Sequence, residues 1–461
     1  MTRVLTIPLL FAVVLSAAAM PARAQDARQD AVHQRVQALE SLMGSSGDEP
    51  LQQFANNHLA PGYRDSFAPG KLLEHLRAVR AAAAYPGGLM VRPGDDGSFH
   101  IHFVAMAGAA DILLKLEPDA PYRITSLEVE GTRPADAGAQ AAPITWETLP
   151  ARMDEESKAG FSGFVYAVHD GKVALSHGYG FADRVKKTPI DENTIFAIGS
   201  TPIDFTRAAV LKLEEMGKLK TSDPITKYVK DVPADKQAIT VDMLMSDSSG
   251  LMNFHEMPGE ADSHRTYIDR DEALRRMMSE KLMFPPGQGT SHSHSAWVLL
   301  AIVVENVSGQ SYGDFLQKNI FAPAGMTRTS LFEGVANIPD EQIAIGYGDV
   351  QAGKINSPKY WGRTSWLAMG SGGMVSTPLD LYRFVTAVRG GKLLAPAQTK
   401  KFGPGGGIEV GGDVHGFLTV HAEQGDDAAV LCSNSHTGPG DRTSAIGMQL
   451  GQMVVGPPRG Q

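Results

Sequence analysis

Ser200 is the residue of this sequence whose type and setting could support nucleophilic chemistry. It lies in the segment Phe196–Thr206, directly before a run with helical spacing that continues to about Leu219. A serine hydroxyl is a weak nucleophile unless a base activates it. The residue three positions later, on the same side of the first helical turn, is Ile203, which cannot accept a proton. The segment therefore offers a nucleophile without an adjacent base.

His292 and His294 are the second group that could do chemistry. Imidazole has an unperturbed pKa of about 6.5, which suits a general base at neutral pH, and a serine–histidine pair is a known way to activate a hydroxyl. One interpretation therefore makes His292 the base for Ser200. The sequence shows no acid that would fix the histidine tautomer, because the direction of Asp204 in the helical run is unknown.

Two His-x-His pairs have a spacing that would also suit a metal. Besides His292 and His294, residues His100 and His102 alternate on a predicted strand and so share a face. Neither pair has a nearby third ligand, and a solvated sheet face is the favoured interpretation of His100 and His102. We therefore expect neither a metal nor a cofactor.

Ser311 stands in the string Gly309-Gln310-Ser311-Tyr312-Gly313, which has the G-x-S-x-G form of a nucleophile elbow. Such an elbow needs a strand before it and a helix after it. A helical pattern precedes this string, so we expect Ser311 to cap the next helix instead.

The elements that must position Ser200 come from both ends of a large region. An Asp-Gly turn at 169–172 predicts a hairpin near its start. A second strand pair, 415–421 and 428–433, and a closing helix, 443–455, lie near its end. We expect an antiparallel sheet built from both ends of this region, with helices between.

Several segments resemble the penicillin-recognising serine hydrolases, a family that includes class C β-lactamases, penicillin-binding proteins and related esterases. The matching segments are 196–206, 239–251, 285–287 with 297–312, 320–326 and 370–378. The resemblance covers roughly residues 150–455. It implies an α/β (α+β) fold of the β-lactamase/transpeptidase type, with an antiparallel sheet flanked by helices and a helical subdomain.

The chain departs from this family at each chemical motif. The family has a lysine three residues after the serine, where this chain has Ile203. His292-Ser293-His294 replaces a Tyr-x-Asn motif, so His292 stands where a tyrosine transfers protons and His294 where an asparagine orients substrate. Imidazole is also shorter than a phenol. No Lys- or His-x-Gly motif can be placed between Phe402 and Phe417.

These departures predict a serine hydrolase by descent that is catalytically impaired or inactive. Losing a general base alone costs ~10²–10⁴ in rate. The favoured hypothesis is a pseudoenzyme that keeps Ser200 and binds a peptide-like or ester ligand beside Ile203 and His294. One alternative is an active esterase or peptidase that uses Ser200 with His292 as base. Another is a scaffold that acts through its N-terminal domain.

The composition along the chain predicts two domains. Residues 25–130 carry helical patterns and then strand-like runs, which favour a small α+β domain. Its element order is similar to that of NTF2-like modules. Residues 131–143 are rich in Ala, Gly and Pro and read as a linker. Residues 144–455 form the large domain.

Residues 1–24 have the features of a signal peptide. Arg3 precedes a short apolar stretch, and Ala22-Arg23-Ala24 fits a cleavage site, so we expect a secreted or periplasmic protein without a membrane span. The formal charge of −9 argues against a nucleic-acid partner. Cys432 is the only cysteine and lies in an apolar run, so we expect a buried thiol and no internal disulfide. The oligomeric state is left open.

Overall fold

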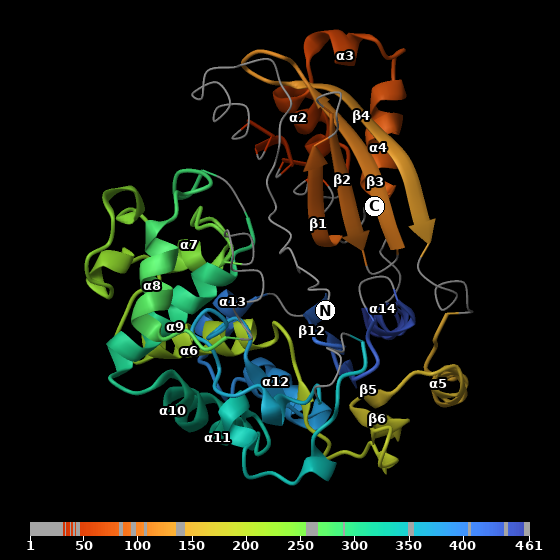
Figure 1. The fold of residues 1–461 in the computed structure, drawn as a ribbon, viewed down its shortest axis with the longest axis vertical. Helices are drawn as coiled ribbons and strands as arrows, with labels where there is room; N and C mark the ends of the chain where they lie inside the picture. Colours follow the sequence, from red (N-terminus) through yellow and green to blue (C-terminus); the bar gives the residue numbers. More distant parts are fainter. Residues whose placement is uncertain are drawn as a thin grey trace, which may run out of the picture. The chain divides into compact units, whose positions relative to one another are not determined.

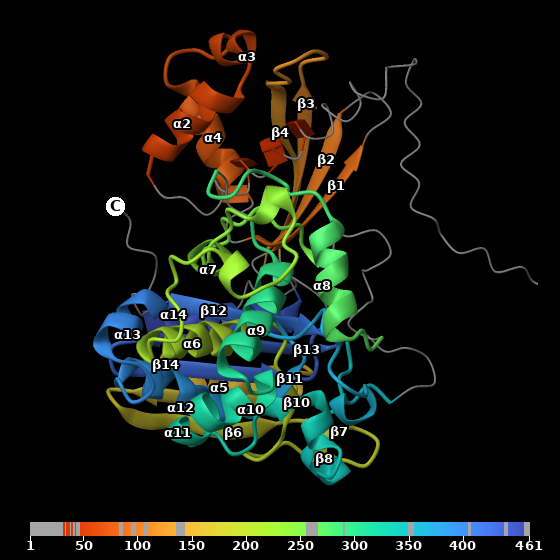
Figure 2. The same cartoon turned by 90° about the vertical axis from the view of Figure 1, so that its left-hand side faces the viewer.

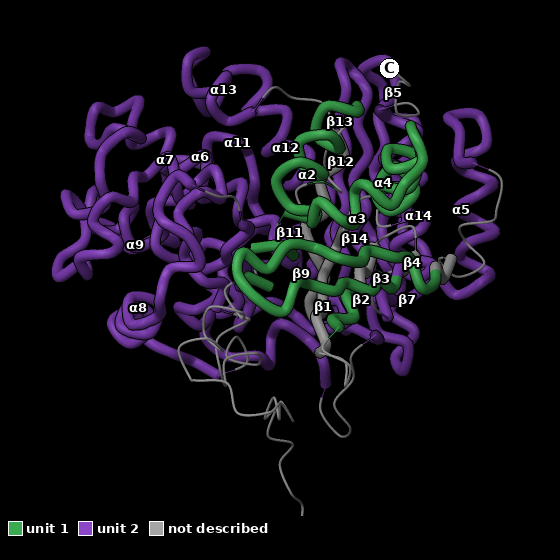
Figure 3. The backbone as a smooth tube through the Cα atoms, turned by 90° about the horizontal axis from the view of Figure 1, so that it is seen from above, with its two compact units in different colours: residues 1–81, 89–102, 111–131 green, residues 82–88, 103–110, 132–461 purple. Residues whose placement is uncertain are grey.

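The computed structural model describes most of the chain in two compact units (Figure 3). The described residues are 31–32, 34–36, 38–39, 42, 47–82, 86–93, 98–105, 108–134, 143–254, 266–288, 291–348, 355–403, 407–437 and 441–455. Residues 1–81, 89–102 and 111–131 belong to the small unit, and residues 82–88, 103–110 and 132–461 to the large one. The predicted signal peptide and residues 135–142 of the predicted linker lie outside the described residues.

The small unit contains helices followed by most of a four-stranded meander (Figure 1). Residues 86–88, 103–105, 108–110 and 132–134 of these strands are grouped with the large unit. Its elements are α2 (Glu49–His58), α3 (Pro61–Asp65), α4 (Lys71–Ala82), β1 (Pro86–Pro93), β2 (Phe99–Ala105), β3 (Gly108–Leu116) and β4 (Ile124–Pro134). Leu51, Leu76, Ile112 and Leu127 are among its buried residues. The predicted order of helices and then strands is present, but β4 continues four residues into the segment that the composition predicted as a linker.

A five-stranded antiparallel sheet forms the centre of the large unit. Its strands are β5 (Gly163–His169), β6 (Lys172–Tyr179), β12 (Gly407–Val414), β13 (Phe417–Gln424) and β14 (Asp427–Ser433). Their spatial order is β12-β13-β14-β5-β6. Strand β5 pairs with β14, in a register that runs from Gly163 opposite Ser433 to Val168 opposite Ala428. The sheet is therefore built from both ends of this region, as the sequence predicted.

Alternate side chains of the central strands enter two apolar layers, one on each face of the sheet. On one face, Val165 and Leu431 pack with α5 (Leu149–Lys158) and α14 (Arg442–Val455). On the other, Phe164 and Val430 belong to the main core, which the remaining helices supply. Figure 2 looks onto the helices of the main core with the strands behind them, and Figure 1 shows α5 and α14 on the other side of the strands.

The helical part of the large unit covers the second face. It contains α6 (Pro202–Glu215), α7 (Val241–Met245), α8 (Arg270–Ser279), α9 (His294–Ser308), α10 (Tyr312–Leu316), α11 (Ala322–Ala324), α12 (Pro378–Arg389) and α13 (Pro396–Phe402). Short strands complete it: β7 (Phe181–Asp183) pairs with β8 (Thr188–Pro189), and β11 (Met374–Ser376) lies between β10 (Ser330–Leu331) and β9 (Phe196–Ala197).

Helix α9 is the central helix of this part. Residues 295–304 are all buried, as expected for a helix that is apolar around its whole circumference. Ser311 caps the following helix, since its hydroxyl accepts a hydrogen bond from Asp314 N at 3.1 Å. The predicted cap is thus confirmed. Among the described helices, none is both long and apolar enough to cross a membrane.

Candidate active site

Ser200 lies in the turn between β9 and α6 and is half-buried. Gly199 has a φ of +52°, a left-handed conformation that glycine adopts without strain. Thr201 N donates to Ile198 O at 3.1 Å, and Pro202 is the first helical residue, where its missing N–H costs nothing. The serine therefore opens a helix, as the sequence predicted.

Ile203 is half-buried and packs against the main apolar core of the large unit. Its backbone N donates to Ser200 O at 3.1 Å, so it lies in the same turn as the serine. The sequence from Ser200 to Arg207 contains no lysine. The first turn of α6 thus has an apolar side chain at the position where a cation or base would act on the serine.

The second motif forms the N-terminus of α9. Ser293 is fully buried, and its hydroxyl donates to Met252 O at 3.4 Å. The ring of His294 packs edge-on against Phe254, with centroids 5.6 Å apart. The ring of His292 lies edge-on to His294 at 5.1 Å, and its side chain is 50% exposed. His294 is therefore held against apolar surface, while His292 faces solvent on one side.

Asp247 supplies the acid that the sequence analysis did not find. Its Oδ1 lies 3.5 Å from Nδ1 of His292, and its backbone O accepts a hydrogen bond from Ser291 N at 2.8 Å. Asp247 has a φ of +56°, in the turn that follows α7. The residue belongs to segment 239–251, one of those that resemble the family, but nothing local to that segment shows that it faces His292.

Helices α6 and α9, which follow Ser200 and His292 in the chain, pack against each other. The structure thus brings together His292, His294 and Asp247, and places Ser200 in the turn before the neighbouring helix α6.

The loop at 369–373 contacts α6, the helix that follows Ser200. The buried Thr206 hydroxyl lies 2.6 Å from Gly370 O and 2.5 Å from the Tyr312 hydroxyl. A Cβ at Gly370 would lie 2.6 Å from Trp297 O on α9, so only glycine allows this approach. Burial raises the pKa of Tyr312, which keeps its hydroxyl neutral. These contacts hold α6, α9 and α10 together about one helical turn after Ser200.

The segment in which the third motif was sought ends in a tight hairpin. After α13 ends at Phe402, β12 forms the edge of the sheet, and the sequence Gly407–Val414 has neither lysine nor histidine. His415 and Gly416, both with positive φ, connect β12 to β13. The ring of His415 lies edge-on to Trp361 at 4.9 Å. The region between Phe402 and Phe417, in which the third motif was sought, thus ends in a two-residue turn.

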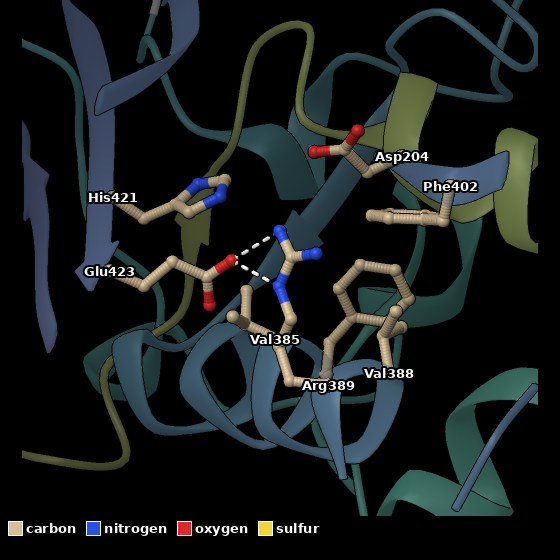
Figure 4. A pocket seen from close by; sticks show the side chains of 8 residues that line it. Asp204, Val385, Val388, Arg389, Phe402, His421 and Glu423 are labelled. Carbon is tan, nitrogen blue, oxygen red and sulfur yellow. Dashed lines mark hydrogen bonds and ion pairs between the residues drawn. The ribbon is translucent and has the colours of Figure 1, made fainter. Parts of the chain in front are cut away.

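A pocket of about 210 Å³, part of it open to solvent, lies beside the first turn of α6. Its walls combine apolar and charged side chains, namely Asp204, Phe384, Val385, Val388, Arg389, Phe402, His421 and Glu423. Figure 4 shows Arg389 paired with Glu423, and His421 and Asp204 facing the same space. Neither Ser200 nor His292 lines it. Asp204 therefore points to this pocket, and it does not contribute to the His292–Asp247 group.

The second histidine pair lies in the small unit. His100 is on β2, and its Nδ1 forms an ion pair with Glu130 Oε2 at 2.9 Å. The side chain of His102 lies outside the described part.

Comparison with known proteins supplies the context of this site. A family described as Beta-lactamase matches residues 148–447. Penicillin-binding protein 4* of Bacillus subtilis is 31% identical over 243 residues, which are 50% of this chain and 53% of the relative. The chain thus spans about half the length of the curated relatives it matches.

Solved structures show the same fold. A penicillin binding protein from Bacillus halodurans has a TM-score of 0.55 and 23% identity, over 64% of this chain and 98% of its own. The D-amino acid amidase from Ochrobactrum anthropi has a TM-score of 0.56 and 23% identity, over 66% of this chain and 96% of its own.

Proposed function

The chain belongs to the beta-lactamase family of serine hydrolases, and from this premise we propose that it binds a peptide-like or ester ligand without the standard acylation of Ser200. The observation that carries this proposal is the packing of Ile203. The half-buried side chain beside the nucleophile packs against the apolar core, and it can neither accept a proton nor supply positive charge. A lysine at position 203 would lie in the same partly buried, apolar surroundings.

The size of the expected loss supports the same proposal. Removing a general base costs ~10²–10⁴ in rate, and removing one member of an interdependent catalytic set costs up to ~10⁶. In this chain His292 and His294 also replace the second motif, and β12 has no Lys- or His-x-Gly sequence. The names of the relatives, a penicillin-binding protein and a D-amino acid amidase, support a peptide-like ligand class.

A second function is favoured by one observation, the ion pair between His292 and Asp247. A carboxylate at Nδ1 fixes the imidazole tautomer that leaves Nε2 free to accept a proton. In this alternative, Ser200, His292 and Asp247 would act as nucleophile, base and orienting acid of an esterase or peptidase. The apolar Ile203 beside Ser200 makes it the less supported function.

We extend the proposal to the remainder of the chain. The helices and four-stranded meander of the small unit support an NTF2-like module, and the features of residues 1–24 support export to the periplasm or the medium. A scaffold function of the small unit is a third proposal. It would be favoured if partner capture by the full chain persisted unchanged after the Ser200 site was blocked by mutation.

The experiment is labelling of the purified protein with a fluorophosphonate serine probe and with a fluorescent penicillin. We expect little or no labelling, and hydrolysis of activated esters near background. Ser200→Ala and His292→Ala are the informative variants, and Ser311→Ala is the matched control because Ser311 only caps α10.

Rapid stoichiometric labelling that disappears in both Ser200→Ala and His292→Ala would replace the first proposal by the second. Asp247→Asn should then slow the labelling. Labelling that persists in both variants would contradict both proposals, since the nucleophile would lie elsewhere.

A further inference from the structure

Three side chains with metal-binding chemistry meet at one end of the central sheet, in the large unit. His169 is the last residue of β5, Asp170 follows it in the turn to β6, and Asp427 is the first residue of β14. Each offers one ligand atom, and these three atoms lie within 4.8 Å of one another. None of its residues belongs to a motif of the Ser200 site, so the cluster does not depend on the proposed function.

The turn is held in place by the backbone. Asp170 N donates to Asp427 Oδ1 at 2.8 Å, and Gly171 N donates to Asp426 O at 3.0 Å. Asp170 and Gly171 have φ values of +49° and +72°, the left-handed pair of a tight hairpin turn. The three side chains are thus brought together before any ion binds.

The imidazole of His169 is fixed both at its edge and on its face. Its Nδ1 lies 2.9 Å from Asp427 Oδ1, and its ring stacks on Trp146 with centroids 4.3 Å apart and planes inclined by 12°. A carboxylate at one ring nitrogen sets the tautomer in which the other nitrogen has a free lone pair. That other nitrogen, Nε2, lies 4.0 Å from Asp170 Oδ2.

We propose that His169, Asp170 and Asp427 form a binding site for a divalent transition-metal ion such as Zn²⁺, Ni²⁺ or Cu²⁺. Nε2 of His169 and the carboxylate of Asp170 are the direct ligands, and water completes the coordination. Asp427 orients the imidazole as the carboxylate of a carboxylate–histidine–metal arrangement. Imidazole nitrogen with carboxylate oxygen selects these borderline ions over Mg²⁺ and Ca²⁺, which prefer oxygen ligands alone.

The exposure of Asp170 distinguishes this site from an ordinary turn. Asp427 already satisfies the backbone of the turn and the Nδ1 of His169. The Asp170 carboxylate is 88% exposed, yet it lies near the nitrogen of His169 that Asp427 leaves uncovered. A bound ion would be held within the β5–β6 hairpin, and Asp427 would link it to β14 only through the imidazole of His169.

Trp146 provides the test, because it stacks on the proposed ligand. We expect Cu²⁺ or Ni²⁺ to quench part of the tryptophan fluorescence of the untagged full-length protein in a saturable manner. Zn²⁺ should compete with Cu²⁺, and it should raise the melting temperature by binding the folded state only.

His169→Gln should abolish the saturable quenching, and Asp170→Asn should weaken binding at least tenfold. Asp427→Asn should weaken it by about 10- to 100-fold, the usual effect of removing an orienting carboxylate. His177→Gln is the matched control, since His177 is an exposed histidine on the neighbouring strand β6.

Trp146→Phe separates the reporter from the site. It should remove the quenching but keep the shift of the melting temperature that Zn²⁺ causes. Quenching and thermal shift that are unchanged in His169→Gln, or equally reduced in His177→Gln, would overturn the proposal.

Discussion

His292 Nδ1 lies 3.5 Å from Asp247 Oδ1, across the contact between the N-terminus of α9 and the turn after α7. The hydrogen bond from Ser291 N to Asp247 O keeps these two segments in register. The acid partner of the imidazole therefore comes from an element that carries neither the nucleophile nor the histidine. Asp247 is thus placed beside the imidazole that the second proposed function would use as its base.

Restoring the family motif should restore acylation. The triple variant Ile203→Lys, His292→Tyr and His294→Asn regains the lysine, the phenol and the amide. We expect its reaction with a fluorescent penicillin to be about 10²–10⁴ times faster than that of the native chain. Ile203→Lys alone should gain little, because the groups act as a set. Adding Ser200→Ala should abolish the gain, and native labelling as fast as that of the triple variant would contradict the prediction.

Thr206→Val should destabilise the large unit. Thr206 is fully buried, and its hydroxyl contacts Tyr312 Oη and Gly370 O. Valine has the same shape but leaves both partners unsatisfied, so we expect a loss of about 1–3 kcal/mol in the free energy of unfolding, measured by urea denaturation. Thr386→Val is the control, since exposed Thr386 makes a similar bond to Tyr382 O within α12. Equal effects of the two variants would rule out the buried network as the cause.

Cys432 should be unreactive in the folded protein. Its side chain is fully buried, and burial raises the pKa of the thiol to about 12. Because the thiolate is the nucleophile, Ellman's reagent at pH 8 should modify Cys432 only in denaturant. The raised pKa also means that this group favours folding below pH 9 and loses that contribution as the pH rises toward 12. Complete modification within minutes under native conditions would contradict this.

Asp441 should contribute stability that is lost in acid. Burial alone would raise the pKa of Asp441, but hydrogen bonds from His436 and from the N–H groups of Thr437 and Ser444 outweigh it and keep the pKa below its usual value. A lowered native pKa favours folding above the unfolded-state pKa of about 4, and this contribution disappears as the pH falls through the native value.

Asp441→Asn should therefore lower the free energy of unfolding by about 1–3 kcal/mol at pH 7, and by less at pH 3. Urea denaturation at both pH values is the measurement. The control is Asp271→Asn, since the side chain of Asp271 is 94% exposed. A difference from the native chain that stays the same at both pH values would exclude the carboxylate charge as its source.

Local patterns predicted those parts of the fold that local physics determines. Pro202 at the first helical position, the Asp170–Gly171 turn and the Ser311 cap each follow from one residue's preferred backbone conformation or hydrogen bond. The buried Cys432 follows from the apolar strand around it. These predictions hold because neighbours along the chain decide them.

The groups that depend on the tertiary fold could not be predicted. Asp247 meets His292, and Asp427 meets His169, only because separate elements pack together. The pairing of Arg389 with Glu423 joins α12 to β13 in the same way. Spacing within one segment carries no information on such contacts, so the candidate site was only partly visible in the sequence.

The pairing of β5 with β14 has a consequence for how the chain is made. Val165 and Leu431 are neighbours in the sheet but lie near opposite ends of the large unit. Bringing two such distant segments together costs conformational entropy before favourable contacts form, so such pairings form slowly. While β14 is still inside the ribosome, the edge of β5 that pairs with it is exposed. Such an unpaired strand edge can pair with another chain. Chains whose synthesis stops shortly before Asp427 should therefore aggregate, because they lack β14, the central strand of the sheet.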